Sequence, residues 1–166
     1  MSGHSRNWDV CFEDRPAQMG AVEKVVWEAW LKKFVDYYER FGLNVPISPD
    51  PAHEKLLRVG SNGTLKHPEP YKIDAVGGSG EECEIIEVKD VGNMTAIGQL
   101  LTYVILFQDQ YKGYAKMHLR LVCRRCPPAI EMSCRMYGIN IDVMEEEVAE
   151  AVKPFRNQKV GESVAG

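Results

Sequence analysis

Two short runs rich in β-branched and apolar residues lie in the middle of the chain, at residues 71–76 and 84–89. Short runs of this kind, bounded by turn residues, are typical of β-strands. The segment between them, GGSGEE, is glycine-rich and indicates a hairpin turn. The pattern therefore predicts an antiparallel pair of strands whose turn is centred near Gly80 and Glu81.

A long amphipathic pattern over residues 21–41 predicts a helix that ends at Gly42, a common C-terminal stop. Glu23 falls in the same direction as the aromatic residues that this helix is expected to bury. A buried carboxylate is costly unless it is paired or bound to a cation, so Glu23 is a candidate metal ligand. The alternative is that Glu23 sits at the first turn, where an acid favours the helix dipole and reaches water. The aromatic residues expected on the buried side are Trp27, Trp30, Phe34, Tyr37 and Phe41.

A second amphipathic helix is predicted for residues 95–111, with Asn93 and Thr95 as candidate N-caps. We expect its apolar stripe to pack on the sheet, and the stripe comprises Ile97, Leu101, Val104, Ile105 and Phe107. Gln99 and Tyr103 point the other way and stack at a spacing of four residues. Their shared face is then free to meet a ligand.

The remaining segments predict further short elements around the same sheet. A hairpin over 55–67 turns at 60–63, and the proline-rich segment 46–51 is a loop. Later elements are a strand at 117–123, a helix at 129–137, a strand at 139–143 and an acidic helix at 145–152. Mixed strands and helices in this order predict an α/β fold, with a mixed central sheet flanked by helices on both faces.

The predicted hairpin brings together two acids and an amine. With the turn near Gly80, Asp74 falls opposite Glu87, and Glu87 shares a strand face with Lys89. Like charges opposite each other in a ladder cost about 0.2–1 kcal/mol when exposed, and more when buried. A cation should lie between them, and two converging carboxylates suit Mg²⁺.

These residues resemble the core motif of the PD-(D/E)XK nuclease superfamily. The motif reads Asp74, twelve intervening residues, then Glu87, Val88 and Lys89, and the residue before Asp74 is Ile73 rather than Pro. Strand, glycine turn, strand and helix follow in the order that the family uses. The alternative is a solvated hairpin face with an ordinary Glu–Lys pair. The resemblance implies a restriction-endonuclease-like core. It also implies a metal-dependent nuclease whose expected substrate is DNA in preference to RNA.

The resemblance also implies roles for single residues. Asp74 and Glu87 would hold Mg²⁺ or Mn²⁺, with the carbonyl of Val88 as a further ligand. Lys89 would orient the attacking water or stabilise the charge that grows on the phosphate. Glu23 would complete the metal shell.

The second helix adds a resemblance to the RecB-like branch of the superfamily. Gln99-x-x-x-Tyr103 is similar to the motif that follows the catalytic Lys in that branch, where it contacts nucleic acid. The alternative is a polar outer face with one surface Tyr.

Composition sets the outer bounds. The chain has 166 residues, of which 45% are hydrophobic and 27% charged, which predicts one domain over 1–152 and a flexible tail over 153–166. No apolar run approaches the about 18 residues of a membrane span, and no signal peptide is visible, so we expect a cytoplasmic protein. The net charge of −4 argues against a general nucleic-acid binder, so a local basic patch must guide the substrate. The candidates for that patch are Lys112, Lys116, Arg120, Arg124, Arg125 and Arg135.

Two other functions stay open. The chain could be a catalytically silent nuclease-fold subunit that binds nucleic acid or a protein partner, and it could form a homodimer. It could also carry an iron–sulfur cluster, as one RecB-like branch does, on Cys11, Cys123, Cys126 and Cys134. Their placement in strands and helices favours buried, unligated thiols. Among the histidines, His67 could approach the site.

Overall fold

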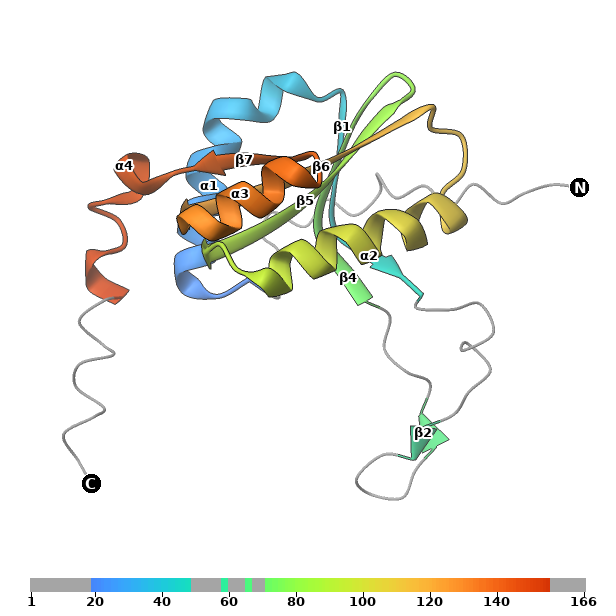
Figure 1. The fold of residues 1–166 in the computed structure, drawn as a ribbon, viewed down its shortest axis with the longest axis horizontal. Coiled ribbons are helices and arrows are strands. Elements are labelled where there is room, and N and C mark those ends of the chain that lie inside the picture. Colours follow the sequence, from blue (N-terminus) through green and yellow to red (C-terminus); the bar gives the residue numbers. More distant parts are fainter. Residues whose placement is uncertain (1–18, 49–57, 60–64, 67–70, 156–166) are drawn as a thin grey trace, which may run out of the picture.

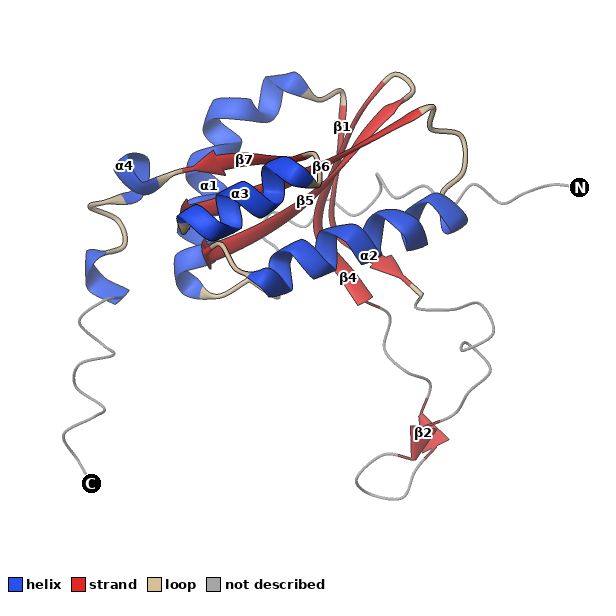
Figure 2. Cartoon of the chain, in the orientation of Figure 1, coloured by secondary structure: helices blue, strands red, loops and turns tan. Residues whose placement is uncertain are grey.

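The computed structural model describes residues 19–48, 58–59, 65–66 and 71–155, and its centre is a five-stranded sheet (Figures 1 and 2). The strands lie in the order β1-β4-β5-β6-β7. Their bounds are Arg40–Ile47 (β1), Tyr71–Ser79 (β4), Glu82–Val91 (β5), Lys116–Arg125 (β6) and Ile139–Val143 (β7). The first three strands are antiparallel and the last two continue parallel to β5, so the sheet is mixed.

The hairpin predicted around Gly80 is confirmed. β4 and β5 pair antiparallel from Ser79 and Glu82 down to Ala75 and Ile86, and Gly80 adopts a φ of 56°. A positive φ is the left-handed conformation that glycine adopts without strain, which explains the residue at this tight turn. Both strands run beyond the expected bounds and enclose only Gly80 and Glu81.

Helices cover both faces of the sheet. In Figure 1, α2 (Met94–Gln110) and α3 (Pro128–Met136) lie in front of the sheet, and α1 (Ala21–Phe34) lies behind it. The short α4 (Glu145–Val148) packs against α1. A mixed sheet between helices confirms the predicted α/β architecture.

Alternation along β5 divides its side chains between two cores. Ile85 packs in the core under α2, whereas Ile86 and Val88 pack with Trp27 and Trp30 of α1. Because the two neighbours of Glu87 in the chain face α1, its own side chain points toward α2. The strand therefore delivers a carboxylate into an otherwise apolar layer.

The predicted helix over 21–41 is wrong in its second half. α1 ends at Phe34, a single 3₁₀ turn η2 (Val35–Tyr37) follows, and β1 starts at Arg40. Phe41 and Leu43 alternate toward the α1 core, and pairing with β4 satisfies the backbone of this segment as a strand. The aromatic spacing of a helix continues to Phe41, so pairing with β4 rather than the local pattern decides the outcome.

Two smaller predictions need correction, and a third concerns residues that the structure does not describe. Pro46 lies within β1 rather than in a loop. Among the strands that the structure describes, β1 is at the sheet edge, where a missing N–H is tolerated. The hairpin predicted over 55–67 is present as β2 (Arg58–Val59) and β3 (Leu65–Lys66), but it forms a separate two-stranded sheet. The tail beyond residue 155 lies outside the described residues.

The buried face of α2 differs from the predicted stripe. Asn93 caps the helix as predicted, accepting the N–H of Ala96 at 2.9 Å. The buried residues are Ala96, Ile97, Leu100, Tyr103 and Phe107, whereas Leu101 and Val104 are only partly buried and Ile105 is exposed. Apolar residues occur all round this helix, so their spacing could not fix which side meets the sheet. None of the described helices is long and apolar enough to cross a membrane.

Candidate functional site

Asp74 and Val88 meet where β4 and β5 separate. The paired residues of the two strands end at Ala75 and Ile86. One step further along β4, Asp74 is buried, and its Oδ2 accepts the backbone N–H of Val88 at 2.9 Å. Where the pairing between β4 and β5 stops, this side-chain hydrogen bond still joins the two strands. It holds Asp74 beside the Glu87-Val88-Lys89 segment.

Glu87 is a buried acid with an unusual protonation equilibrium. Its side chain is 2% exposed, and its Oε1 accepts Lys89 Nζ at 2.6 Å. Burial is the largest influence on the pKa of Glu87, and the negative charge of Asp74 adds to it. Together they raise this pKa to about 8, although the positive charge of Lys89 lowers it. The predicted repulsion between Asp74 and Glu87 is therefore present, and Lys89 relieves it only in part.

Lys89 is the counter-charge of this cluster. Burial lowers its pKa, but the attraction of Glu87, Asp74 and Glu23 outweighs burial and leaves the pKa above the ordinary value. Lys89 is therefore positively charged at neutral pH. A protonated amine cannot act as a general base, so its chemistry is limited to donating hydrogen bonds and stabilising negative charge.

Gln99 and Tyr103 lie beside the acidic pair, although Tyr103 is far less accessible than predicted. Tyr103 is 7% exposed and its hydroxyl accepts Gln99 Nε2 at 3.2 Å. Burial raises the pKa of Tyr103, and Glu87 and Asp74 add to this effect, which places the hydroxyl within electrostatic range of both acids. The expected stacking of Gln99 on Tyr103 is thus observed, on the site side of α2.

Glu23 lies at the first turn of α1, as the alternative interpretation of the sequence expects. Its Oε2 accepts the backbone N–H of Gly20 at 2.8 Å, which caps the first turn of α1. Its charge also raises the pKa values of Glu87 and Lys89, so it lies within range of the site. Glu23 therefore lies near the acidic pair, and its side chain caps the first turn of α1.

Several buried polar atoms in this region lack a hydrogen-bond partner. Glu87 Oε2 and Gln99 Oε1 are both buried without one. The side-chain amide of Asn44, which falls between the residues paired with Ala75 and Ile73, is also buried and unpaired. Buried polar atoms are normally satisfied, so the unpaired oxygen of Glu87 is the feature of this region that calls for a partner.

The donor set is compatible with a hard divalent cation but is not assembled around one. Within the described ranges, no group of three or more His, Cys, Asp or Glu side chains is arranged to hold a metal ion. The unpaired oxygen of Glu87 next to Asp74 fits the oxygen ligands that Mg²⁺ and Mn²⁺ prefer. Glu23 accepts the Gly20 N–H through Oε2 and is not arranged with Asp74 and Glu87 as a ready three-ligand group.

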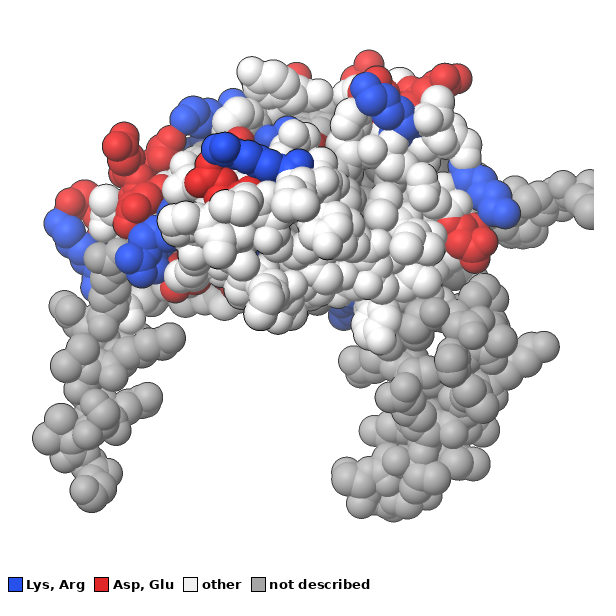
Figure 3. Space-filling model, viewed as in Figure 1, with Lys and Arg blue, Asp and Glu red and all other residues white. Residues whose placement is uncertain are grey.

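The predicted basic patch is largely neutralised. Five of its six members form ion pairs: Lys116 with Glu82, Arg120 with Glu84 and Asp142, Arg124 with Asp90, Arg125 with Glu145, and Arg135 with Glu131. Lys112 alone of the six has no ion-pair partner among the residues that the structure describes. On the face shown in Figure 3, blue and red residues accordingly lie intermingled rather than as one basic surface.

The cysteines behave as thiols in the described part of the chain. Cys83, Cys123, Cys126 and Cys134 are free, and burial raises the pKa of each. Thiolates, rather than thiols, ligate iron and zinc. Cys11 and His67 lie outside the described residues.

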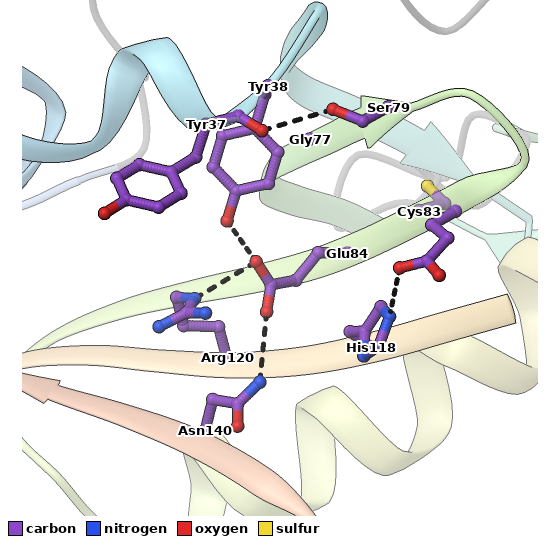
Figure 4. A pocket seen from close by; sticks show the side chains of 10 residues that line it. Tyr37, Tyr38, Gly77, Ser79, Cys83, Glu84, His118, Arg120 and Asn140 are labelled. Carbon is purple, nitrogen blue, oxygen red and sulfur yellow. Dashed lines mark hydrogen bonds and ion pairs between the residues drawn. The ribbon is translucent and has the colours of Figure 1, made fainter.

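A second polar cluster, missed from the sequence, lies on the α1 side of the sheet. Glu84 accepts Tyr38 Oη, Arg120 Nε at 3.1 Å and Asn140 Nδ2 at 3.3 Å (Figure 4). These residues line a pocket of 260 Å³ with Tyr37 at its edge. The sequence could have indicated a buried acid here, because Glu84 shares a strand face with the apolar residues Ile86 and Val88. The acid and the guanidinium satisfy each other, so the cluster stabilises the sheet and presents no unpaired group comparable to Glu87.

No protein-family model, curated protein or solved structure matched this chain in comparison. The geometry of the site is therefore the basis for any statement about function. Its central feature is a buried, electrostatically strained pair of acids beside a protonated lysine, positioned by β4, β5 and α2.

Proposed function

We propose that the chain is a metal-dependent nuclease that hydrolyses phosphodiester bonds, with DNA as the preferred substrate over RNA, on a restriction-endonuclease-like core. The observation that carries the proposal is the unpaired, buried Oε2 of Glu87 beside the buried carboxylate of Asp74. Two acids held together in an apolar layer raise the free energy of the folded chain, and a bound cation offsets that cost. Stability alone gives no reason for this arrangement.

The cation would be held by Asp74 and Glu87, with the carbonyl of Val88 and the carboxylate of Glu23 as additional ligands. A bound Mg²⁺ or Mn²⁺ supplies an activated water and neutralises charge on a phosphate. The hydrogen bond from Val88 N–H to Asp74 Oδ2 fixes one carboxylate beside the backbone that carries the other.

Lys89 supplies the positive charge for the reaction. Because its pKa is raised, it remains an ammonium group and can donate to a non-bridging phosphate oxygen as the P–O bond to the leaving group breaks. In the absence of substrate the ammonium is held by Glu87 Oε1. The acid therefore keeps Lys89 directed at the site until a phosphate competes for it.

Gln99 and Tyr103 would position the substrate. Gln99 Oε1 is buried and unpaired while its Nε2 donates to Tyr103 Oη, so the pair offers a fixed polar edge next to the acids. Five of the six expected basic residues are engaged in ion pairs, so local contacts at this edge must supply much of the binding.

The test is cleavage of labelled single-stranded, duplex, flapped and branched DNA, and of matched RNA, with Mg²⁺, with Mn²⁺ and with chelator. We expect cleavage that requires the cation and that Lys89→Ala abolishes. Lys33→Ala, which removes an exposed lysine paired with Glu147, is the matched control and should retain activity. Cation-dependent cleavage that survives Lys89→Ala would overturn the assignment of the site.

A catalytically silent nuclease-fold subunit is the second candidate, and specific observations favour it. Lys89 Nζ already donates to Glu87 Oε1 at 2.6 Å, Glu23 is engaged in its helix cap, and no ready-made group of three ligands occurs in the described ranges. Titration calorimetry separates the two functions. A silent subunit would bind nucleic acid or a protein partner with no uptake of divalent cations.

A further inference from the structure

Tyr71, the first residue of β4, presents an exposed aromatic ring beside the candidate site. It is 48% exposed, and its ring centroid lies 6.2 Å from that of Tyr103, with 35° between the ring planes. Side chains alternate along a strand, so Tyr71 points to the same face as Ile73, which packs in the core under α2. Glu87 points to that face as well. The ring of Tyr71 therefore lies on the side of the sheet that carries the acidic pair.

Tyr103 connects this ring to the two acids. Burial raises the pKa of Tyr103 most, and the charges of Glu87 and Asp74 raise it further, which places its hydroxyl within their electrostatic range. A ligand that rests on the exposed part of Tyr71 is then one ring away from the acids. Tyr37, by contrast, is 72% exposed but lies against Phe34, on the α1 side of the sheet.

The charges around the site favour a contact with a base over a further contact with a phosphate. A nucleic-acid strand carries one negative charge per nucleotide, and affinity for that backbone comes from lysine and arginine. Most of the candidate basic residues are engaged in ion pairs, and the site itself contains two acids. Stacking of a base on an aromatic ring needs no positive charge and supplies affinity for single strands of any sequence.

We infer that Tyr71 stacks on a nucleobase of a single-stranded substrate, next to the phosphate that the acidic pair would address. In a duplex each base is covered on both faces by its neighbours, so a free base face occurs only in a single strand or at a strand end. The substrate class is therefore a single strand, or the single-stranded part of a flap. The inference rests on the proposed function, because the stacked base belongs to the strand that the site would cut.

Binding of short DNA strands in chelator tests the inference without any cleavage. The probes are a labelled oligothymidylate, an abasic strand of the same length and a blunt duplex. Since stacking on one ring changes affinity by about tenfold, the wild type should prefer oligothymidylate to the abasic strand by that factor. Tyr71→Leu, which keeps an apolar side chain next to Tyr103 but has no aromatic face, should lose this preference and bind the duplex as the wild type does. Tyr71→Phe should keep the preference.

Tyr37→Leu is the matched control, since it removes an exposed tyrosine from the other side of the sheet and should leave the base preference unchanged. Circular dichroism verifies that the variants stay folded. Photo-cross-linking then locates the contact. An oligothymidylate that carries one iodouracil should cross-link to Tyr71 on irradiation, as mass spectrometry of the digested adduct would show. Equal affinity of the wild type for the two single strands, a base preference that survives Tyr71→Leu, or a cross-link at Tyr37 would overturn the inference.

The outcomes for the stacking site are distinguishable from those for the nuclease. A base preference that depends on Tyr71, in a protein that cleaves no strand with Mg²⁺ or Mn²⁺, would overturn the nuclease and keep the stacking site. Cation-dependent cleavage that Lys89→Ala abolishes, together with an unchanged base preference in Tyr71→Leu, would overturn the stacking site alone.

Discussion

The protonation of Glu87 predicts an unusual dependence of stability on pH. In the folded chain its pKa is about 8, compared with an ordinary value of 4.5. A carboxyl whose pKa is raised by folding is protonated in the native state and ionised in the unfolded state between these values. Folding therefore takes up a proton, and the free energy of unfolding falls as the pH rises through this window.

The size of the effect follows from the pKa difference. A difference of about 3.5 corresponds to about 5 kcal/mol over the whole window, as an upper bound for a coupled pair. Between pH 6 and pH 9, the share lost is about 3 kcal/mol. In a domain of this size such a loss lowers the Tm by on the order of 10 °C.

Glu87→Gln isolates this contribution. Glutamine keeps an oxygen for Lys89 but cannot ionise, so the variant should lose most of the decline between pH 6 and pH 9 in chelator-treated buffer. Glu82→Gln is the control, because Glu82 lies on the same strand, is 55% exposed, and has a pKa lowered by its bond to His118. Denaturant unfolding at each pH measures the difference. An identical pH dependence in wild type and Glu87→Gln would refute the reasoning.

Two further predictions concern the elements that position the site. Gly77→Ala places a Cβ too close to the ring carbons of Tyr38, so we expect a loss of about 1–3 kcal/mol by denaturant unfolding, much reduced in a Tyr38→Ala background. Equal losses in both backgrounds would contradict the contact. Asn93→Ala removes the cap at Ala96 N–H and should cost about 1 kcal/mol, with Asn93→Ser restoring most of it. An unchanged midpoint in Asn93→Ala would show that the cap carries no stability.

The sequence predicted the centre of the fold because its signals there are local. Alternation and a glycine turn defined the hairpin, whose register brings Asp74 opposite Glu87. Asn93 and the spacing of α2 placed Gln99 over Tyr103. Each of these depends on residues a few positions apart, for which backbone geometry leaves few alternatives.

The errors arose where distant pairing decides the outcome. The sequence predicts a helix up to Phe41 because the aromatic spacing of α1 continues that far, although β1 begins at Arg40. Only the pairing of this segment with β4 distinguishes the two structures. The buried face of α2 could not be chosen when apolar residues occur on all its sides. The basic residues predict a patch, but the carboxylate partners of Lys116, Arg120 and Arg124 lie on the strands β5 and β7, which the sequence does not reveal as neighbours of β6.

The central claim is that the Asp74–Glu87 pair binds a divalent cation, and calorimetry of Mn²⁺ binding tests it without requiring the right substrate. At pH 7 the raised pKa keeps Glu87 protonated, so a cation that binds there must displace that proton. Titrations in two buffers of different ionisation enthalpy should give nearly one proton released per Mn²⁺ bound, and Glu87→Gln should abolish the release. Absence of Mn²⁺ binding at millimolar concentration, or binding with no proton release in the wild type, would contradict the account.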